Sequence, residues 1–353
     1  MSNNTDSRTA THVLPCLRNQ SNGQAPPPFF PAIYEHKGFF INETPSAISR
    51  SGDLLAKGVL AEYEALKPDA LTIGIDVYNL EAEAAGCKVT FYEGDDISIP
   101  GINPSNHIIK MGDDISCLQQ ANPLTAGRMP VNIEAARQVV KAVGNDVWVR
   151  GAISGPFSLA VSLIGAEPLF MATLDDPDFV HALLKYSVDL IKDFGKAYID
   201  VGADVILFDS QASADLLPPE MYDAFILEPM KELIRYFKEQ GVADVPLVIG
   251  GTTTPMIDTL IDTGANNLLC DYNCDWPLWY EACKAKNLAV RRNIDSNFIK
   301  HSTPDKIYEV AKKYIEESQR YAGYIMGTAV IPYGTENENL LAIKQACIDS
   351  VND

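Results

Sequence analysis

Two aspartates stand directly after short apolar runs of the sequence, where a side chain could meet a substrate. Asp76 follows residues 71–75, and Asp209 follows residues 203–208. In a parallel α/β fold, ligands bind at the carboxyl ends of the strands. A carboxylic acid at such a place could position a leaving group or give it a proton. The competing interpretation is a solvated turn residue or a helix cap, which describes most aspartates.

Further residues near expected strand ends could bind a substrate. Tyr78 follows the first of the two aspartates, and Asp271 and Tyr272 follow a later apolar run. Arg291 and Arg292 end another run, so one of these two side chains should point into the fold and the other outwards. An inward arginine could hold a substrate carboxylate, and a structural salt bridge is the competing role.

These residues need a fold that gathers several strand ends, and the pattern of the chain predicts one. Apolar runs of strand length alternate with amphipathic helical segments, with about one pair every thirty residues. The expected strands are residues 29–34, 71–75, 146–150, 203–208, 245–249, 267–270, 288–291 and 324–326. This alternation predicts a single (β/α)8 barrel of parallel strands, with an open doubly wound sheet as the alternative.

Other segments complete the expected layout. A helix is expected at residues 45–66 with Ser46 as its cap, and a short helix and then a strand at 88–92 should follow Asp76. Residues 94–129 form a turn-rich loop, which at that length is usually functional or an insertion. The strand at 146–150 should break at Gly151. Further helices are expected at residues 130–143, 157–163, 178–201, 219–240, 254–263, 276–286, 303–321 and 336–350.

Composition places limits on domains and partners. Residues 1–27 are polar and proline-rich, so we expect a flexible N-terminal segment ahead of one barrel domain over residues 28–353. The chain has 28 basic and 47 acidic residues, a formal net charge of -19, which argues against a nucleic-acid partner and against binding to an anionic membrane. Seven widely spread cysteines argue against a disulfide framework.

The location of the protein is also an expectation at this stage. No apolar run is long enough to span a bilayer, and the polar start lacks the order of charges and apolar residues of a signal peptide. We therefore expect a cytoplasmic protein without a membrane partner. A homodimer stays open as a further assembly.

Several segments, in order along the chain, carry a family resemblance. They are Ile73-Gly-Ile-Asp76 with Gly86-Cys-Lys-Val89, Gly155-Pro-Phe-Ser-Leu159, Gly202-Ala-Asp-Val-Ile206 with Asp209-Ser-Gln-Ala-Ser213, Pro218-Pro-Glu-Met-Tyr222 and Asn293-Ile-Asp-Ser296. Together they resemble the uroporphyrinogen decarboxylase superfamily over roughly residues 28–350. The resemblance implies a single (β/α)8 barrel with the site in its mouth. The superfamily includes porphyrinogen decarboxylases and cobalamin-dependent methyltransferases that act on coenzyme M or on aryl methyl ethers.

The decarboxylase branch fits the residues poorly. The resemblance implies an arginine-rich N-terminal motif, a tyrosine after the Gly-Pro turn and a late histidine, which together hold a tetrapyrrole with many carboxylates. Residues 31–38 contain no arginine, residues 158–162 no tyrosine and residues 330–334 no histidine. Only Asp76 matches the catalytic aspartate of that branch. A decarboxylase-like lyase therefore remains an alternative.

The methyltransferase branch implies a Lewis acid, usually zinc, that makes the donor or acceptor reactive. In the coenzyme M enzymes, His-x-Cys at a strand end and a later Cys hold the zinc. The equivalent segments 247–252 and 327–330 contain none of these ligands. The aryl-ether enzymes use other ligand combinations, so the branch itself is retained.

A replacement zinc site would need other side chains. Zinc accepts His, Cys, Asp and Glu, and our candidates are Glu81, Glu83, His107 and Cys270. Glu81 and Glu83 are two positions apart on a helix, so at most one of them can be a ligand. An exposed helix face, a surface histidine and a buried small cysteine are the competing interpretations.

Taken together, the sequence predicts a corrinoid-dependent methyltransferase. In this hypothesis a small methylated substrate, an aryl methyl ether, gives its methyl group to cob(I)alamin carried by a separate corrinoid protein, with zinc as a further cofactor. Asp76 and Asp209 would position or protonate the leaving group. A non-catalytic binding barrel that lost its metal site is the alternative from a different class.

Overall fold

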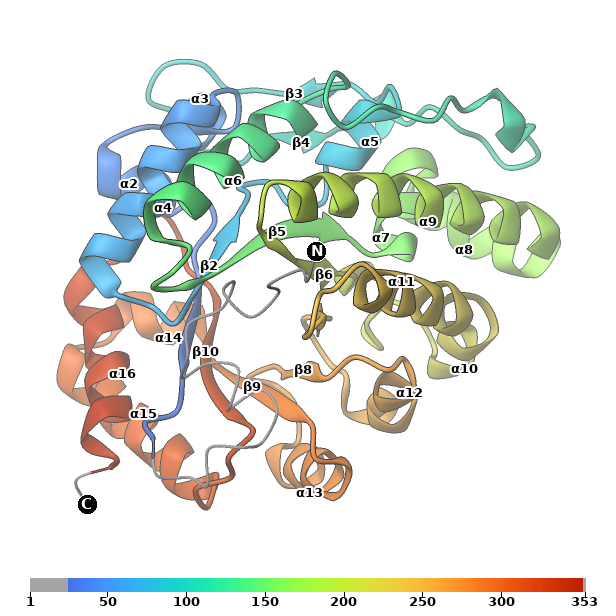
Figure 1. The fold of residues 1–353 in the computed structure, drawn as a ribbon. Helices are drawn as coiled ribbons and strands as arrows, with labels where there is room; N and C mark the ends of the chain where they lie inside the picture. The colour runs from blue at the N-terminus through green and yellow to red at the C-terminus, as the bar shows by residue number, and fades with distance from the viewer. Residues whose placement is uncertain (1–24, 352–353) are drawn as a thin grey trace, which may run out of the picture.

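Eight parallel strands form one sheet that curves round a single axis, and helices cover its outer side (Figure 1). The computed structural model describes residues 25–351, so most of the expected flexible segment 1–27 lies outside the described residues. The sheet order is β1 (Phe29–Ala32), β10 (Tyr324–Val330), β9 (Ala289–Ile294), β8 (Asn267–Cys270), β7 (Pro246–Val248), β6 (Asp204–Phe208), β5 (Trp148–Ser154) and β2 (Ala70–Ile73).

The two ends of this sheet meet through a single residue. Phe29 N of β1 donates to Asp69 Oδ2 over 2.8 Å, and Asp69 N donates back to Phe29 O over 3.1 Å. Asp69 directly precedes β2, so it links β1 to β2 where no strand ladder joins them. The sheet and the helices around it form a single (β/α)8 barrel, as the alternation in the sequence predicts.

The helices agree with the expected alternation. Those that cover the barrel or cap its ends are α2 (Lys37–Ile41), α3 (Pro45–Ile48), α4 (Gly52–Leu66), α5 (Leu80–Ala84), α6 (Met129–Val143), α7 (Pro156–Ile164), α8 (Ala166–Asp175), α9 (Pro177–Asp200), α10 (Pro219–Met221), α11 (Leu227–Glu239), α12 (Ile257–Asp262), α13 (Trp276–Lys286), α14 (Ser296–His301), α15 (Pro304–Glu317) and α16 (Asn337–Asp349). A π-helical turn, Tyr222–Ile226, joins α10 to α11.

Two predicted strands are present but differ from the structure in their bounds. The strand expected at 88–92 is only β3 (Val89–Thr90), which pairs antiparallel with β4 (Gly101–Ile102) outside the barrel. Its residues are half-buried. The strand expected to break at Gly151 continues to Ser154. Gly151 is needed there because a Cβ would lie 2.3 Å from the ring of Tyr198.

The helix expected at 45–66 is two helices, and its cap is displaced. The Thr44 side chain accepts a hydrogen bond from Ala47 N at the start of α3. Ser46 instead accepts from Tyr92 N, which ties α3 to the segment after β3. The side chain of Ser51 then caps α4.

Inward-facing side chains fill the barrel in layers. Near the amino ends of the strands lie Phe30, Ala70, Trp148, Ala289 and Ile325. Nearer the carboxyl ends lie Ala32, Tyr34, Val77, Ala152, Ile206, Phe208, Val248 and Leu269. Barrel interiors are usually filled by such apolar residues, so polar side chains at the axis require an explanation.

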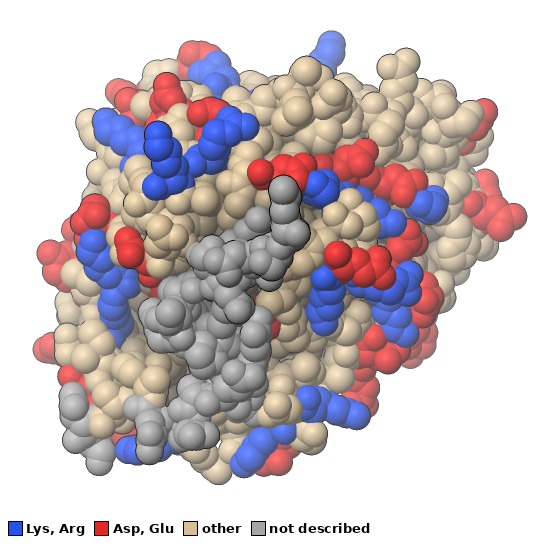
Figure 2. Space-filling model, in the orientation of Figure 1, with Lys and Arg blue, Asp and Glu red and all other residues tan. Residues whose placement is uncertain are grey.

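Charged side chains on the outer helices are intermixed. Figure 2 shows acidic and basic groups side by side towards the right of the view. On the outer helices, Lys192 pairs with Glu232 between α9 and α11, and Lys185 pairs with Asp189 within α9. Exposed pairs of this kind contribute little to stability.

Within the described residues, no single helix has both the length and the apolar character needed to cross a membrane. One bent pair, α7 with α8, satisfies the length and composition test only when its two helices are taken together.

The fit of Gly151 against Tyr198 gives the first prediction. Gly151→Ala should lower the free energy of unfolding by about 1–3 kcal/mol, because the added methyl group forces the packed ring to move. Gly101→Ala is the control, since the nearest atom to its Cβ would be 4.0 Å away. Urea unfolding followed by circular dichroism measures both. Equal effects of the two substitutions would contradict the packing argument.

Candidate active site

A cavity of about 310 Å³ opens at the carboxyl ends of the barrel strands. Apolar side chains, among them Phe208, Val248 and Leu269, make up much of its wall. A mostly apolar cleft with a few polar groups is the usual form of a small-molecule site. The cavity brings together four of the predicted site residues, Asp76, Tyr78, Asp271 and Arg291.

Asp76 is held by a bidentate ion pair that the sequence did not predict. Arg128 Nη1 donates to Asp76 Oδ1 over 3.0 Å, and Nη2 donates to Oδ2 over 2.6 Å. The Nε of the same arginine donates to Glu83 Oε2 over 2.6 Å. The guanidinium also stacks on Phe91, 4.9 Å from the ring centroid. Arg128 therefore joins the loop after β2, helix α5 and the start of α6.

This ion pair decides what Asp76 can do. Burial raises the pKa of Asp76, and the facing guanidinium of Arg128 opposes that rise. Both carboxylate oxygens are already hydrogen-bonded, so Asp76 is better suited to positioning its loop than to giving away a proton. The only sequence signal for Arg128 was its place just before the helix expected at 130–143.

Tyr78 places a hydroxyl on the cavity wall. It donates to Ser210 Oγ over 2.9 Å, and that oxygen also accepts from Gly250 N over 3.0 Å. Burial raises the pKa of Tyr78 to about 12, so the phenol keeps its proton at neutral pH. The Tyr78 ring lies nearly perpendicular to that of Phe208, with centroids 6.4 Å apart. Tyr78 is thus a fixed hydrogen-bond donor beside an aromatic wall.

Asp271 anchors the opposite side of the cavity. Its Oδ1 accepts from Asn293 Nδ2 and from Tyr272 N, both over 3.0 Å. Its Oδ2 accepts from Gly251 N over 2.9 Å. Asn293 Oδ1 in turn accepts from Arg291 Nε over 3.2 Å. Asp271 therefore orients Arg291 through the amide of Asn293.

The paired arginines behave as the strand pattern predicts. Arg291 lines the cavity, whereas Arg292 points outwards, stacks on Tyr314 and pairs with Glu317 over 2.7 Å. Tyr272 was expected to contact substrate, but its side chain is 47% exposed and does not line the cavity.

Glu35 also lines the cavity and was missed in the sequence. Its Oε2 is buried and has no hydrogen-bond partner among the described residues. Burial raises the pKa of this carboxyl group. Glu35 follows β1 by three residues, so it fits the rule that functional side chains lie just after the strands, the strand-end rule. Its sequence segment gives no other indication of a chemical role.

Asp209 lies behind the cavity wall rather than in it. Its side chain is fully buried, and its Oδ1 accepts from Ser158 N in the first turn of α7 over 2.6 Å. Gly155 allows this approach, since a Cβ there would lie 2.2 Å from the carboxyl carbon. Burial raises the pKa of Asp209 to about 6. In this position Asp209 fastens α7 to the end of β6.

The four candidate zinc ligands are not brought together. Glu81 accepts from Ser154 N and Oγ, and Glu83 is paired with Arg128. The Nδ1 of His107 lies 2.9 Å from Ser162 O. Cys270 faces away from the cavity, at the outer side of β8. Over residues 25–351, no group of three or more His, Cys, Asp and Glu could hold a metal ion. These residues therefore do not fit a shared zinc site.

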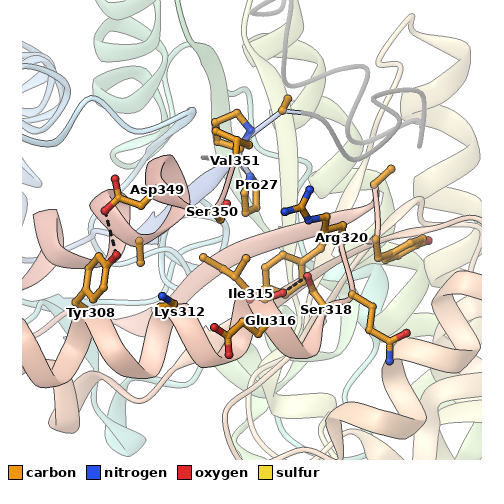
Figure 3. Close-up of a pocket in the computed structure, with 17 residues that line it drawn as sticks. Pro27, Tyr308, Lys312, Ile315, Glu316, Ser318, Arg320, Asp349, Ser350 and Val351 are labelled. Atoms are coloured by element: carbon orange, nitrogen blue, oxygen red, sulfur yellow. Dashed lines mark hydrogen bonds between the residues drawn. The ribbon is translucent and has the colours of Figure 1, made fainter. Parts of the chain in front are cut away.

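A larger cavity, of about 440 Å³, lies near the amino ends of β1 and β10 (Figure 3). Among its polar groups, Tyr308 donates to Asp349 and Ser318 donates to Ile315 O. None of the predicted site residues lines it. It also borders Ala25, where the described chain begins. The candidate active site is therefore the cavity of about 310 Å³ at the carboxyl ends of the strands, which we call the mouth cavity.

The sequence of this chain is similar to those of several known proteins. The family model described as Uroporphyrinogen decarboxylase (URO-D) matches residues 25–349. The methylcobamide:CoM methyltransferase MtbA of Methanosarcina acetivorans is 28% identical over 70% of this chain and 71% of its own. The methylated-thiol–coenzyme M methyltransferase of Methanosarcina mazei is 25% identical over 83% of this chain and 76% of its own.

A decarboxylase and a protein of known structure are also similar to this chain. A uroporphyrinogen decarboxylase of a Synechococcus strain is 25% identical over 82% of this chain and 81% of its own. A solved methyltransferase structure from Methanosarcina mazei covers 97% of this chain and 98% of its own, with a TM-score of 0.84 and 20% sequence identity. This structure confirms the fold.

The ion pair of Arg128 gives the second prediction. Arg128→Ala should lower the free energy of unfolding by about 3–5 kcal/mol at pH 8, because it leaves the Asp76 carboxylate buried and unpaired. The pKa of Asp76 would then lie further above its unfolded value. The penalty should therefore shrink as the pH falls and Asp76 takes up a proton. Urea unfolding at several pH values measures this.

The matched control for that experiment is Arg137→Ala, on the same helix. Arg137 is exposed, and within residues 25–351 its one ion pair is with Glu134, one turn away. Its removal should change stability little at any pH. A pH-independent loss in the Arg128 variant would mean that stacking on Phe91, and not the charge pair, carries its contribution.

The third prediction concerns the buried carboxyl of Glu81. Burial raises its pKa to about 7, so the folded state holds a proton that the unfolded state releases near pH 4.5. Stability from this group is complete below that pH and is lost as the pH rises through 7, by up to about 3 kcal/mol. Glu81→Gln should remove that part of the pH dependence. Unfolding midpoints compared with wild type from pH 4.5 to 8 test it, and parallel curves would contradict it.

Proposed function

The chain belongs to the uroporphyrinogen decarboxylase family, and on that premise we propose that it is a corrinoid-dependent methyltransferase. It takes a methyl group from a small methylated donor and passes it to cob(I)alamin carried by a separate corrinoid protein. Support comes from the methylcobamide:CoM methyltransferases among its relatives. The donor that we propose is an aryl methyl ether.

The mouth cavity is the main support for an aryl methyl ether as the donor. Its volume of about 310 Å³ is at the small end of ligand sites, which suits one substituted aromatic ring better than a tetrapyrrole. Among the described side chains that line it, Arg291 is the one cation. A decarboxylase substrate with many carboxylates would need several. The rings of Tyr34 and Phe208 meet edge to face with centroids 5.7 Å apart, and they offer an aromatic wall to a flat substrate.

The chemistry breaks the methyl–oxygen bond of the donor. The corrinoid supplies the electron pair that takes the methyl group. The two electrons of the broken bond stay on the aryl oxygen, which leaves as a phenolate and is protonated by water on release. Tyr78, which carries its proton at neutral pH, would turn this proton from Ser210 Oγ towards the aryl oxygen and donate a hydrogen bond to it. The sequence predicts that Asp76 positions or protonates the leaving group directly. In this proposal it would instead position Tyr78, because its ion pair with Arg128 holds the loop that carries this tyrosine.

The other predicted site residues take different parts in this proposal. Asp271 would orient Arg291 rather than contact the reacting atoms. Asp209 would hold α7 in place from behind the wall. The proposal includes no zinc site, because the predicted ligands are not gathered in the described residues.

The fourth prediction tests the reaction directly. The purified chain, incubated anaerobically with chemically reduced cob(I)alamin and a methoxylated aromatic compound, should form methylcobalamin and the matching phenol. Absorbance spectra and mass spectrometry follow the two products. Tyr78→Phe should lower the rate about 10²-fold, as removal of one hydrogen-bond donor to a developing oxyanion does. Arg137→Ala on outer helix α6 serves as the control.

The same assay can decide against the proposal. If none of a panel of methoxylated aromatics yields methylcobalamin, but uroporphyrinogen releases carbon dioxide, the decarboxylase alternative is correct. If neither reaction occurs although the chain binds aromatic compounds, the non-catalytic barrel is favoured.

A further inference from the structure

Two arginines point into the barrel axis from opposite sides. Arg150 lies on β5 and Arg291 on β9, and three strands separate them in the sheet. They are 2% and 6% exposed. Both line a small space of about 10 Å³ at the axis, and Arg291 also lines the mouth cavity above it. Arg291 therefore connects the floor of the candidate active site with the barrel interior.

Neither arginine has a carboxylate partner among the described residues. Arg150 Nη2 donates to Thr72 Oγ1 over 3.1 Å, while its Nε and Nη1 are buried without a hydrogen-bond partner in this part of the chain. Its guanidinium lies over the rings of Phe30 and Trp148, 4.9 and 4.8 Å from their centroids. Burying an unpaired cation is unfavourable, and two of them near each other more so.

Neighbouring residues hold the side chain of Arg291 in place. Its Nε donates to Asn293 Oδ1, and Asn293 is itself held by Asp271. Gly327 on the adjacent strand makes room for the arginine stem, because a Cβ there would lie 2.6 Å from Arg291 Cγ. Asp271 reaches Arg291 through the amide of Asn293, and the two side chains make no direct ion pair. The Nη groups of Arg291 have no hydrogen bond to any described residue.

From this arrangement we propose that Arg291, supported by Arg150, binds one carboxylate of the methyl donor at the floor of the mouth cavity. A guanidinium matches a planar carboxylate through two parallel hydrogen bonds. The aromatic ring then lies against Tyr34 and Phe208, and the methoxy group points towards Tyr78. Resting on the proposed function, this narrows the donor to a methoxylated aromatic carboxylate rather than a neutral methoxyarene.

Binding without turnover tests this subsite independently of the reaction. Isothermal titration of the full chain with 4-methoxybenzoate and with the neutral isostere 4-methoxybenzamide compares the same ring with and without the charge. The wild type should bind the carboxylate at least tenfold more tightly. Arg291→Gln should abolish this preference, and Arg291→Lys should retain part of it. Arg292→Gln, on the same strand but facing outwards, should leave the preference intact.

Arg150 provides a second, independent measurement. Arg150→Gln should weaken carboxylate binding less than Arg291→Gln does, and its thermal midpoint should stay the same or rise, because an unpaired buried charge is removed. A large fall in the thermal midpoint together with an unchanged carboxylate preference would make Arg150 a structural residue and overturn its part of the proposal.

Other outcomes separate this inference from the proposed function. If methylcobalamin forms equally well from 4-methoxybenzamide and the two ligands bind alike, the carboxylate subsite is wrong and the methyltransferase proposal stands. If the carboxylate preference depends on Arg291 but no methyl transfer occurs, the subsite stands and the proposed reaction is wrong. Tighter binding of 2-mercaptoethanesulfonate than of 4-methoxybenzoate would overturn the assignment to a carboxylate.

Discussion

The alternation of side chains along the barrel strands is the constraint on which the site depends. Successive residues of a strand face opposite sides, so every position is committed either to the axis or to the helices. On β9 this sends Arg291 to the cavity and Arg292 to Tyr314 and Glu317 outside. One step along the strand thus separates a cation that lines the cavity from one that packs on the outer side of the barrel.

The same constraint explains which predicted residues reached the cavity and which did not. Phe208 faces the axis, so the next residue, Asp209, turns towards α7 and is buried behind the wall. Leu269 and Asp271 face the cavity, which leaves Cys270 between them on the outer side. The strand-end rule located these segments correctly. It could not choose between neighbouring residues, because strand register depends on the whole closed sheet.

Part of the site comes from a loop, and no local sequence pattern predicts it. Arg128 comes from the end of the long segment 94–129, yet its guanidinium pairs with Asp76, 52 residues earlier in the chain. The alternation of strands and helices was predictable because it repeats and has a characteristic period. The strand expected at 88–92 is shorter and lies outside the barrel, because a short apolar run does not show which sheet a strand joins. A contact such as that between Arg128 and Asp76, made when a loop folds back, has no periodic pattern in the sequence that could predict it.

The barrel also shows why net charge is a poor guide to the ligand of a buried site. A formal charge of -19 argued against polyanionic partners, and surface charges are indeed what a large partner meets. Such charges are screened within about 8 Å at physiological salt, whereas a charge in the low-dielectric interior is not. Two arginines at the axis can therefore dominate the potential at the cavity floor of a strongly acidic protein. Local geometry, and not the sum over the chain, sets the charge of the molecule that this cavity accepts.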